Sequence, residues 1–209
     1  MTIAILADNI LKEEWLAKGV REEVELIWVD SVSSLVMIEA DAYFDLLFDG
    51  DPERTLKLKQ LSGKLVFINA VQWTGKAIGQ PFIRINAWPT LLRRPVVEMA
   101  LTGQSQEAAV KNIFEALQWR YQLVPDTCGM ITSRVLAMIV NEAYFTFGEG
   151  VSSKEEIDIA MRLGTNYPMG PFEWSAAIGL KKIKELLKEL GRTDERYRVA
   201  PALEKEIPG

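Results

Sequence analysis

Few side chains in this sequence could carry acid–base, nucleophilic or metal chemistry. The 209 residues include no histidine and one cysteine, Cys128, which argues against a zinc or other soft-metal site and against a histidine-containing triad. Without a histidine partner, Cys128 is expected to be a small buried hydrophobe rather than a nucleophile.

Asp30 is the first candidate binding residue. It ends an apolar run and stands 23 residues after Ala7, the spacing of an acid that binds the ribose of a dinucleotide. Such a site also needs a glycine-rich turn after the first strand, because the backbone must approach the pyrophosphate. The glycine positions here hold Ala7, Asn9 and Lys12. The sequence therefore predicts that NAD is not bound.

The first half of the chain alternates short apolar runs with short helical patterns, which is typical of a parallel, doubly wound α/β sheet. On the first helix, Leu11, Trp15 and Leu16 are expected to share one apolar face. Strands are expected at 3–6, 24–29, 42–48, 65–69, 82–86 and 96–101, and helices at 10–18, 52–61 and 104–119.

From Cys128 onward the pattern is helical. Residues 129–148 are apolar on nearly all sides, so this helix is expected to be buried on most faces. Ser153 and Glu156 fit a capping box, and Pro171 fits the first turn of a later helix. The predicted organisation is a reduced Rossmann-like α/β domain, residues 1–124, followed by an all-helical domain, residues 125–209.

The second half resembles the helical domain of the 3-hydroxyacyl-CoA dehydrogenases, with the 3-hydroxybutyryl-CoA dehydrogenases as the nearest type. The resemblance implies a dinucleotide-binding domain, then a helical domain that closes over acyl-CoA and carries the dimer interface. This chain resembles a shortened and degenerate member, and the run from Asn166 to Glu173 is interpreted as a structural turn between two helices. The resemblance is carried by residues 126–134, 141–143, 153–158 and 163–173.

The resemblance also points to three vestigial catalytic positions. Glu98 matches the glutamate that orients the family's catalytic histidine, and twelve residues earlier, where that histidine belongs, stands Asn86. An asparagine cannot accept a proton at any useful pH, so the base is missing. Ser133 stands where relatives carry the asparagine that holds the substrate carbonyl, and its shorter side chain can still donate one hydrogen bond.

These losses favour a catalytically impaired family member, a pseudoenzyme that dimerises or binds or regulates a partner. Two alternatives remain open. One is a functional NAD-dependent oxidoreductase acting on 3-hydroxyacyl-CoA in fatty acid metabolism, with Glu98 as base. The other is an acyl-CoA-binding protein without turnover.

Charge and hydropathy restrict the partners and the compartment. The net charge of −5 and the lack of a basic stripe interleaved with aromatics argue against nucleic acid. Only residues 129–148 approach membrane-spanning length, and polar residues interrupt them. We expect a cytoplasmic protein that is not inserted in a membrane and that forms a homodimer through its helical domain.

Overall fold

The computed structural model describes residues 1–103 and 106–207. The chain forms two compact units, Met1–Met130 and Ile131–Gly209. The sequence patterns put the boundary after residue 124, but the next six residues pack with the first unit. Asp126 accepts hydrogen bonds from that unit, and the Gly129 N–H donates to the Val71 carbonyl at 2.8 Å. The predicted domain limits themselves stay a prediction.

The first unit is built on a seven-stranded sheet with the order β2-β1-β3-β4-β5-β6-β7. All neighbouring strands are parallel except β5 and β6, which are antiparallel. The predicted α/β class with a predominantly parallel sheet is confirmed, and the antiparallel pair is the departure from it. The strands are β1 (Thr2–Leu6), β2 (Glu25–Val29), β3 (Ala42–Asp45), β4 (Leu65–Ile68), β5 (Ile83–Ile85), β6 (Val96–Ala100) and β7 (Arg120–Leu123).

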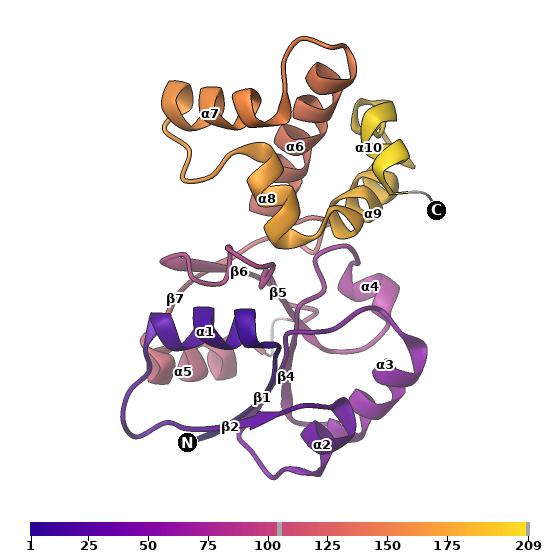
Figure 1. The fold of residues 1–209 in the computed structure, drawn as a ribbon. Coiled ribbons are helices and arrows are strands. Elements are labelled where there is room, and N and C mark those ends of the chain that lie inside the picture. Colours follow the sequence, from indigo (N-terminus) through magenta and orange to yellow (C-terminus); the bar gives the residue numbers. More distant parts are fainter. Residues whose placement is uncertain (104–105, 208–209) are drawn as a thin grey trace. The chain divides into compact units, whose positions relative to one another are not determined.

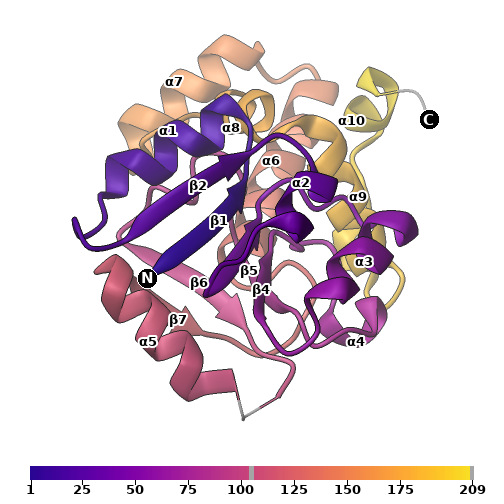
Figure 2. The ribbon, with the colours of Figure 1, turned by 90° about the horizontal axis from the view of Figure 1, so that it is seen from below.

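Helices cover both faces of this sheet. α1 and α5 lie on one face, and α2 and α3 lie on the other (Figures 1 and 2). The predicted start, at Gln104, of the helix expected at 104–119 falls outside the described residues. The helices are α1 (Asn9–Lys18), α2 (Val32–Met37), α3 (Pro52–Leu58) with a 3-10 turn at Lys59–Leu61, α4 (Gly75–Ile78) and α5 (Glu107–Leu117).

Aromatic rings fill the core between the sheet and the layer of α1 and α5. Trp15 is fully buried, and its ring lies 4.9 Å from that of Phe44 and 4.4 Å from that of Trp119. The prediction that Leu16 belongs to the apolar face of α1 was wrong, because this residue is 53% exposed. The helical period puts position 14 beside Leu11 and Trp15, so Glu14 turns inward instead.

The second unit is all helical, as predicted. The predicted capping box of α7 is present: the Glu156 N–H donates to the Ser153 hydroxyl at 3.3 Å, and the Ser153 N–H donates to the Glu156 carboxylate at 3.2 Å. Pro171 opens α8 as expected. The helices are α6 (Thr132–Gly148), α7 (Lys154–Thr165), α8 (Pro171–Ile178), α9 (Leu180–Gly191), a 3-10 turn at Glu195–Tyr197, and α10 (Pro201–Glu206).

The first of these helices was expected to be buried on most faces, and four of its seventeen residues, Val135, Glu142, Phe147 and Gly148, are exposed. α6 buries one side, which includes Leu136, Val140 and Tyr144, whereas Val135 is 56% exposed. α7 also presents apolar side chains, and Leu163 is 83% exposed. A small helical unit offers packing partners on one side of each helix only, so the second apolar side of α6 remains at the surface.

Residues 166–174 comprise the connection from α7 to α8 and the first turn of α8. The Asp158 carboxylate accepts the Phe172 N–H at 2.8 Å and the Glu173 N–H at 3.1 Å, which caps the first turn of α8. Gly170 lies against this carboxylate, and a Cβ at that position would stand 2.2 Å from an Asp158 oxygen. The glycine is therefore required by close packing, and none of these contacts performs acid–base chemistry.

Candidate functional site

The carboxyl ends of the central strands in the first unit are tied together by Asn69. Its side-chain amide donates to the carbonyls of Leu46 and Ala87 at 3.1 and 3.0 Å, and its amide oxygen accepts the Ala87 N–H at 3.0 Å. Asn69 is 4% exposed. The loops that follow β3, β4 and β5 are thus joined at the edge of the sheet where α/β proteins bind ligands.

Asn86 and Glu98 meet at this edge on the antiparallel pair β5–β6. The Asn86 side chain donates to the Glu98 carboxylate at 3.1 Å, and the Asn86 N–H donates to the Glu98 carbonyl at 3.0 Å. The structure therefore brings together the two residues whose twelve-residue spacing the sequence singled out. Because the amide acts as a donor, the carboxylate is the one group of this pair that can take up a proton.

Ser133 lies in the other unit. It belongs to the first turn of α6 and is fully buried. Its predicted role as a hydrogen-bond donor to a substrate carbonyl stays a prediction.

The turn between β1 and α1 does not fit a dinucleotide. Asp8 is the N-cap of α1, and its carboxylate accepts the Leu11 N–H at 2.8 Å. A pyrophosphate binds at this helix end because the N–H groups there are free and the helix dipole is positive. The Asp8 carboxylate already uses that donor and adds a negative charge.

Two further residues of the expected cofactor site have partners inside the protein. The Lys12 ammonium, at one of the glycine positions, lies 5.1 Å from the centroid of the Trp28 ring. Asp30 is exposed beyond the end of β2 and accepts a long hydrogen bond from the Ser34 hydroxyl at 3.4 Å. Asp30 is therefore available to solvent, but the phosphate-binding part of a dinucleotide site is absent from this turn.

Sequence reasoning did not predict two buried charges near this edge. Arg84 in β5 is completely buried and donates to Asp126 at 2.5 Å, to the Ala70 carbonyl at 2.9 Å and to the Thr127 carbonyl at 3.2 Å. A cation in the apolar run Phe82–Ile85 was the available signal, because a buried charge needs a partner.

The Asp126 carboxylate also closes the first turn of α4. It accepts the Gly75 N–H at 2.8 Å and the Lys76 N–H at 3.3 Å. Burial alone would raise the pKa of Asp126, but these N–H groups and Arg84 together hold the pKa below its usual range. Asp126 thus stays ionised and neutralises the buried guanidinium.

Glu14 is the second buried charge. Only 8% of the residue is exposed, and its carboxylate accepts the Thr90 N–H at 2.5 Å and the Arg93 N–H at 3.2 Å. The signal in the sequence was its position three residues after Leu11 and next to Trp15 on the apolar face of α1.

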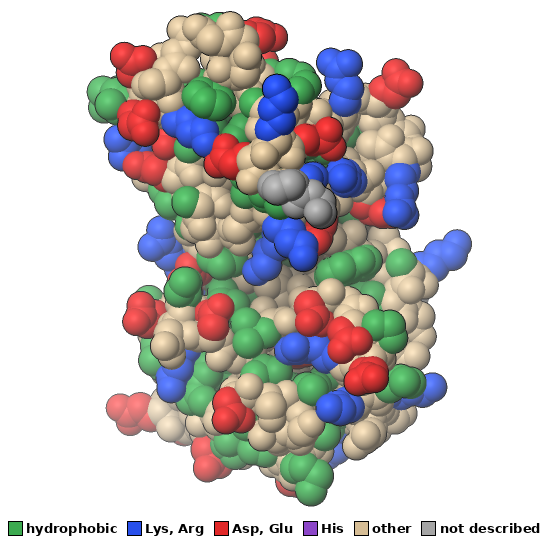
Figure 3. Space-filling view, turned by 45° about the vertical axis from the view of Figure 1, so that its right-hand side comes forward, with side chains coloured by type: hydrophobic (Ala, Val, Ile, Leu, Met, Phe, Trp, Pro, Cys, Tyr) green, Lys and Arg blue, Asp and Glu red, His purple; other side chains and the backbone are tan. Residues whose placement is uncertain are grey.

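Basic and acidic side chains are interspersed on the face that Figure 3 shows, so charge of one sign does not dominate this face. No helix within residues 1–103 and 106–207 is long and apolar enough to cross a bilayer. Within the same ranges, no group of three or more His, Cys, Asp or Glu residues could hold a metal ion.

Comparison with known proteins finds sequences and structures that are similar to this chain. Residues 129–207 match the family model described as 3-hydroxyacyl-CoA dehydrogenase, C-terminal domain. The chain is 40% identical over 108 residues to 3-hydroxyadipyl-CoA dehydrogenase of Escherichia coli K12, covering 49% of this chain and 23% of that protein. It is 32% identical over 134 residues to 3-hydroxybutyryl-CoA dehydrogenase of Clostridioides difficile, covering 63% and 47%.

The chain thus spans less than half the length of these curated relatives. Among solved structures, the (S)-3-hydroxybutyryl-CoA dehydrogenase of Ralstonia eutropha aligns with a TM-score of 0.73 and 20% identity, over 98% of this chain and 92% of that one. The likeness at this identity establishes a shared fold.

Proposed function

We propose that the chain is a member of the 3-hydroxyacyl-CoA dehydrogenase family that lacks dehydrogenase activity and acts by binding a partner. The observation that carries the proposal is the Asn86–Glu98 contact, in which an amide donates to the carboxylate at 3.1 Å. In this family's reaction, as the resemblance implies, a histidine takes the proton of the 3-hydroxyl while a carboxylate orients it. Here the carboxylate is kept and its partner cannot accept a proton.

The hydride acceptor meets a second obstacle. Oxidation of a 3-hydroxyl needs a nicotinamide next to the base, and the turn after β1 offers the Asp8 carboxylate where a pyrophosphate would bind. Loss of the base alone leaves cofactor binding intact, and loss of the cofactor turn alone leaves the base intact. Both changes in one chain support a protein selected for a role other than turnover.

Turnover is tested by following NADH absorbance with acetoacetyl-CoA as substrate, beside the Clostridioides difficile 3-hydroxybutyryl-CoA dehydrogenase as positive control. We expect no oxidation of NADH above the rate without protein. Oxidation that disappears in Glu98→Gln would refute the proposal and favour an enzyme that uses Glu98 as its base. Thermal shifts with acetoacetyl-CoA alone distinguish a third outcome, acyl-CoA binding without turnover, because a ligand at 100 times its Kd adds about 2.7 kcal/mol.

The partner that we propose is a second copy of the chain, bound through the helical unit. A groove of about 420 Å³ between α6 and α7 is mainly apolar, and it includes Ile139, Ala160 and Met161. Val135 on α6 and Leu163 on α7 add exposed apolar surface to the same two helices. Exposed apolar surface of this kind is typical of protein interfaces.

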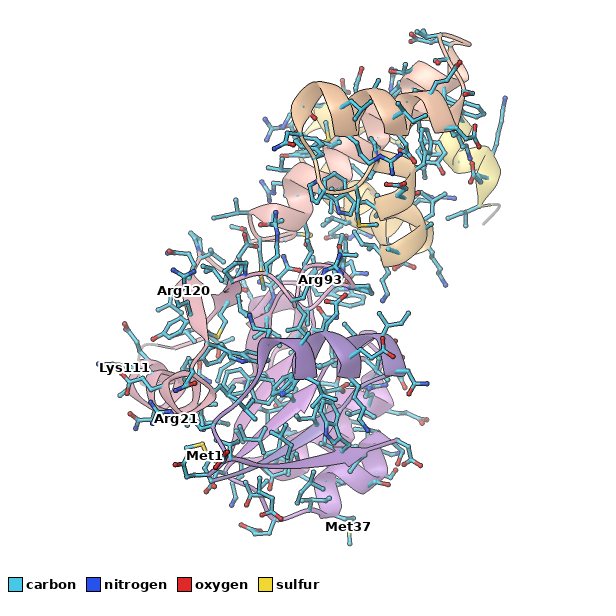
Figure 4. The ribbon with its side chains drawn as sticks, turned by 60° about the vertical axis from the view of Figure 1, so that its left-hand side comes forward. Met1, Arg21, Met37, Arg93, Lys111 and Arg120 are labelled. Atoms are coloured by element: carbon cyan, nitrogen blue, oxygen red, sulfur yellow. The ribbon has the colours of Figure 1, made fainter. Side chains whose placement is uncertain are left out.

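Sedimentation at several concentrations tests this interface with a matched pair of variants. Leu163 and Met37 are both 83% exposed. Leu163 belongs to α7 of the helical unit, and Met37, which Figure 4 labels, belongs to α2 of the sheet unit. We expect Leu163→Lys to convert dimers to monomers and Met37→Lys to leave the dimer unchanged. A monomeric wild-type chain, or a dimer that tolerates Leu163→Lys, would contradict this arrangement.

A further inference from the structure

The loop between β5 and β6 folds its backbone N–H groups around one carboxylate. The Leu91 N–H donates to the Trp88 carbonyl at 2.9 Å and the Arg94 N–H donates to the Leu91 carbonyl at 3.3 Å, so two turns follow each other. The N–H groups of Thr90 and Arg93, which take part in neither of these two turn hydrogen bonds, donate to the two oxygens of Glu14. Figure 4 labels Arg93 in this loop.

The backbone of this loop is held in a conformation that costs energy. Thr90 has a φ of +74°, in the left-handed region that non-glycine residues rarely adopt. A β-branched residue persists there only when its surroundings compensate for the strain. The convergence of the Thr90 and Arg93 N–H groups on a buried anion provides such compensation, because hydrogen bonds to an ionised acceptor are the strong ones.

We propose that residues Trp88–Arg93 form an anion-binding cradle, and that Glu14 occupies it as a built-in ligand. Backbone N–H groups that converge from a turn with a positive φ make a concave site for carboxylate or phosphate oxygens. The Glu14 carboxylate is 8% exposed and reaches the loop from 76 residues earlier in the sequence. The contact fastens the loop onto α1 without any external ligand.

The loop between β5 and β6 is held at two places along the edge of the sheet. Asn69 joins the start of the same loop to the end of β3, through the carbonyls of Ala87 and Leu46. Glu14 then fixes the middle of the loop to α1. The inference goes beyond the proposed function, since a chain with or without turnover could carry this cradle, and the NADH assay and the following test can fail independently.

Chemical rescue tests the cradle. Glu14→Ala removes the built-in carboxylate, and Glu13→Ala, one residue earlier on the exposed side of α1, is the matched control for helix propensity. We expect Glu14→Ala to lower the folding equilibrium constant on the order of 10- to 100-fold, because two partly buried hydrogen bonds from N–H groups to the carboxylate are lost. Sodium formate should restore much of this loss in a saturable way, by about 100-fold at 100 times its Kd, compared with sodium chloride at equal ionic strength.

Equal stability of the two alanine variants would overturn the proposal, and so would identical effects of formate and chloride on Glu14→Ala. If Glu14→Ala does not fold in chloride, Glu14→Gln keeps one acceptor oxygen and loses the charge. We then expect faster hydrogen exchange at the Thr90 and Arg93 amides than in the wild-type protein. Unchanged exchange at both amides in a folded Glu14→Gln protein would also refute the cradle.

Discussion

The ion pair of Arg84 and Asp126 offers the sharpest test of how this fold is held together. Asp126→Asn keeps an oxygen that can accept the Gly75 N–H but removes the charge that faces a completely buried guanidinium. Arg84 would keep carbonyl partners only, among them Ala70 and Thr127. A buried cation without a counter-charge is strongly unfavourable, so the free energy of unfolding should fall.

The expected size follows from the burial of the two side chains. Breaking a buried ion pair costs about 3–5 kcal/mol, and the low end applies here because the Asp126 side chain is 26% exposed. Glu39→Gln is the matched control. Its pair with Lys64 has almost the same length, 2.6 against 2.5 Å, but the two side chains are 89% and 41% exposed. The control should leave the unfolding midpoint unchanged, because exposed pairs contribute little.

Urea unfolding followed by tryptophan fluorescence measures this difference. Trp174 is the one tryptophan in the second unit, so a Trp174→Phe background restricts the signal to the first unit. A loss of about 3 kcal/mol corresponds to a midpoint lower by roughly 1–3 M urea. Equal midpoints for Asp126→Asn and Glu39→Gln would refute the reasoning that burial decides the strength of these pairs.

The same pair predicts a dependence of stability on pH. The pKa of Asp126 is lower in the folded protein than its usual value, so its contribution is fully present above the unfolded-chain pKa of about 3.9. The contribution is lost as the pH falls through the folded-state value. Wild-type protein should therefore lose more stability than Asp126→Asn between about pH 5 and pH 2, and parallel curves would contradict the assignment.

Two further predictions concern the helical unit. Gly170→Ala should destabilise it by about 1–3 kcal/mol in thermal unfolding, because the new Cβ would stand 2.2 Å from an Asp158 oxygen. Gly164→Ala is the control: a Cβ at that position would have no neighbouring atom within 4 Å, so this variant should be neutral or stabilising. Lys154→Met should lower the free energy of unfolding by about 1 kcal/mol, because the Lys154 ammonium lies 5.1–5.3 Å from the centroids of three aromatic rings. Lys181→Met is the control, and it should change the melting temperature little because the Lys181 side chain is 80% exposed.

The alternation of apolar runs in the sequence was sufficient to predict the α/β class, because period-two and period-3.6 patterns report local burial. It could not predict which strands become neighbours, so the antiparallel pairing of β5 with β6 was missed. β7 was also missed, because its four residues, Arg120–Leu123, alternate exposed and half-buried positions. The exposed side of α6 shows that burial can also be overestimated, because apolar residues at a surface look the same in sequence as those in a core.

The candidate site shows the same division between local and distant information. The spacing of Asn86 and Glu98 was enough to predict that the two positions belong together, and they do form a hydrogen bond. The partners of Glu14 and Arg84 lie 76 and 42 residues away. No local pattern encodes contacts over such separations, although a charged residue on an apolar face signals that a partner exists.

The separation of 42 positions between Arg84 and Asp126 also sets the order in which the first unit can be completed during synthesis. Strands β1 to β5 can pair once they have left the ribosome, but Arg84 has no counter-charge until Asp126 has been made. A fragment that ends at residue 124 would carry all seven strands and still hold an uncompensated cation in its core. A fragment that ends at Met130 would include the carboxylate, so we expect the shortest fragment of this unit that folds by itself to extend past its last strand to Asp126.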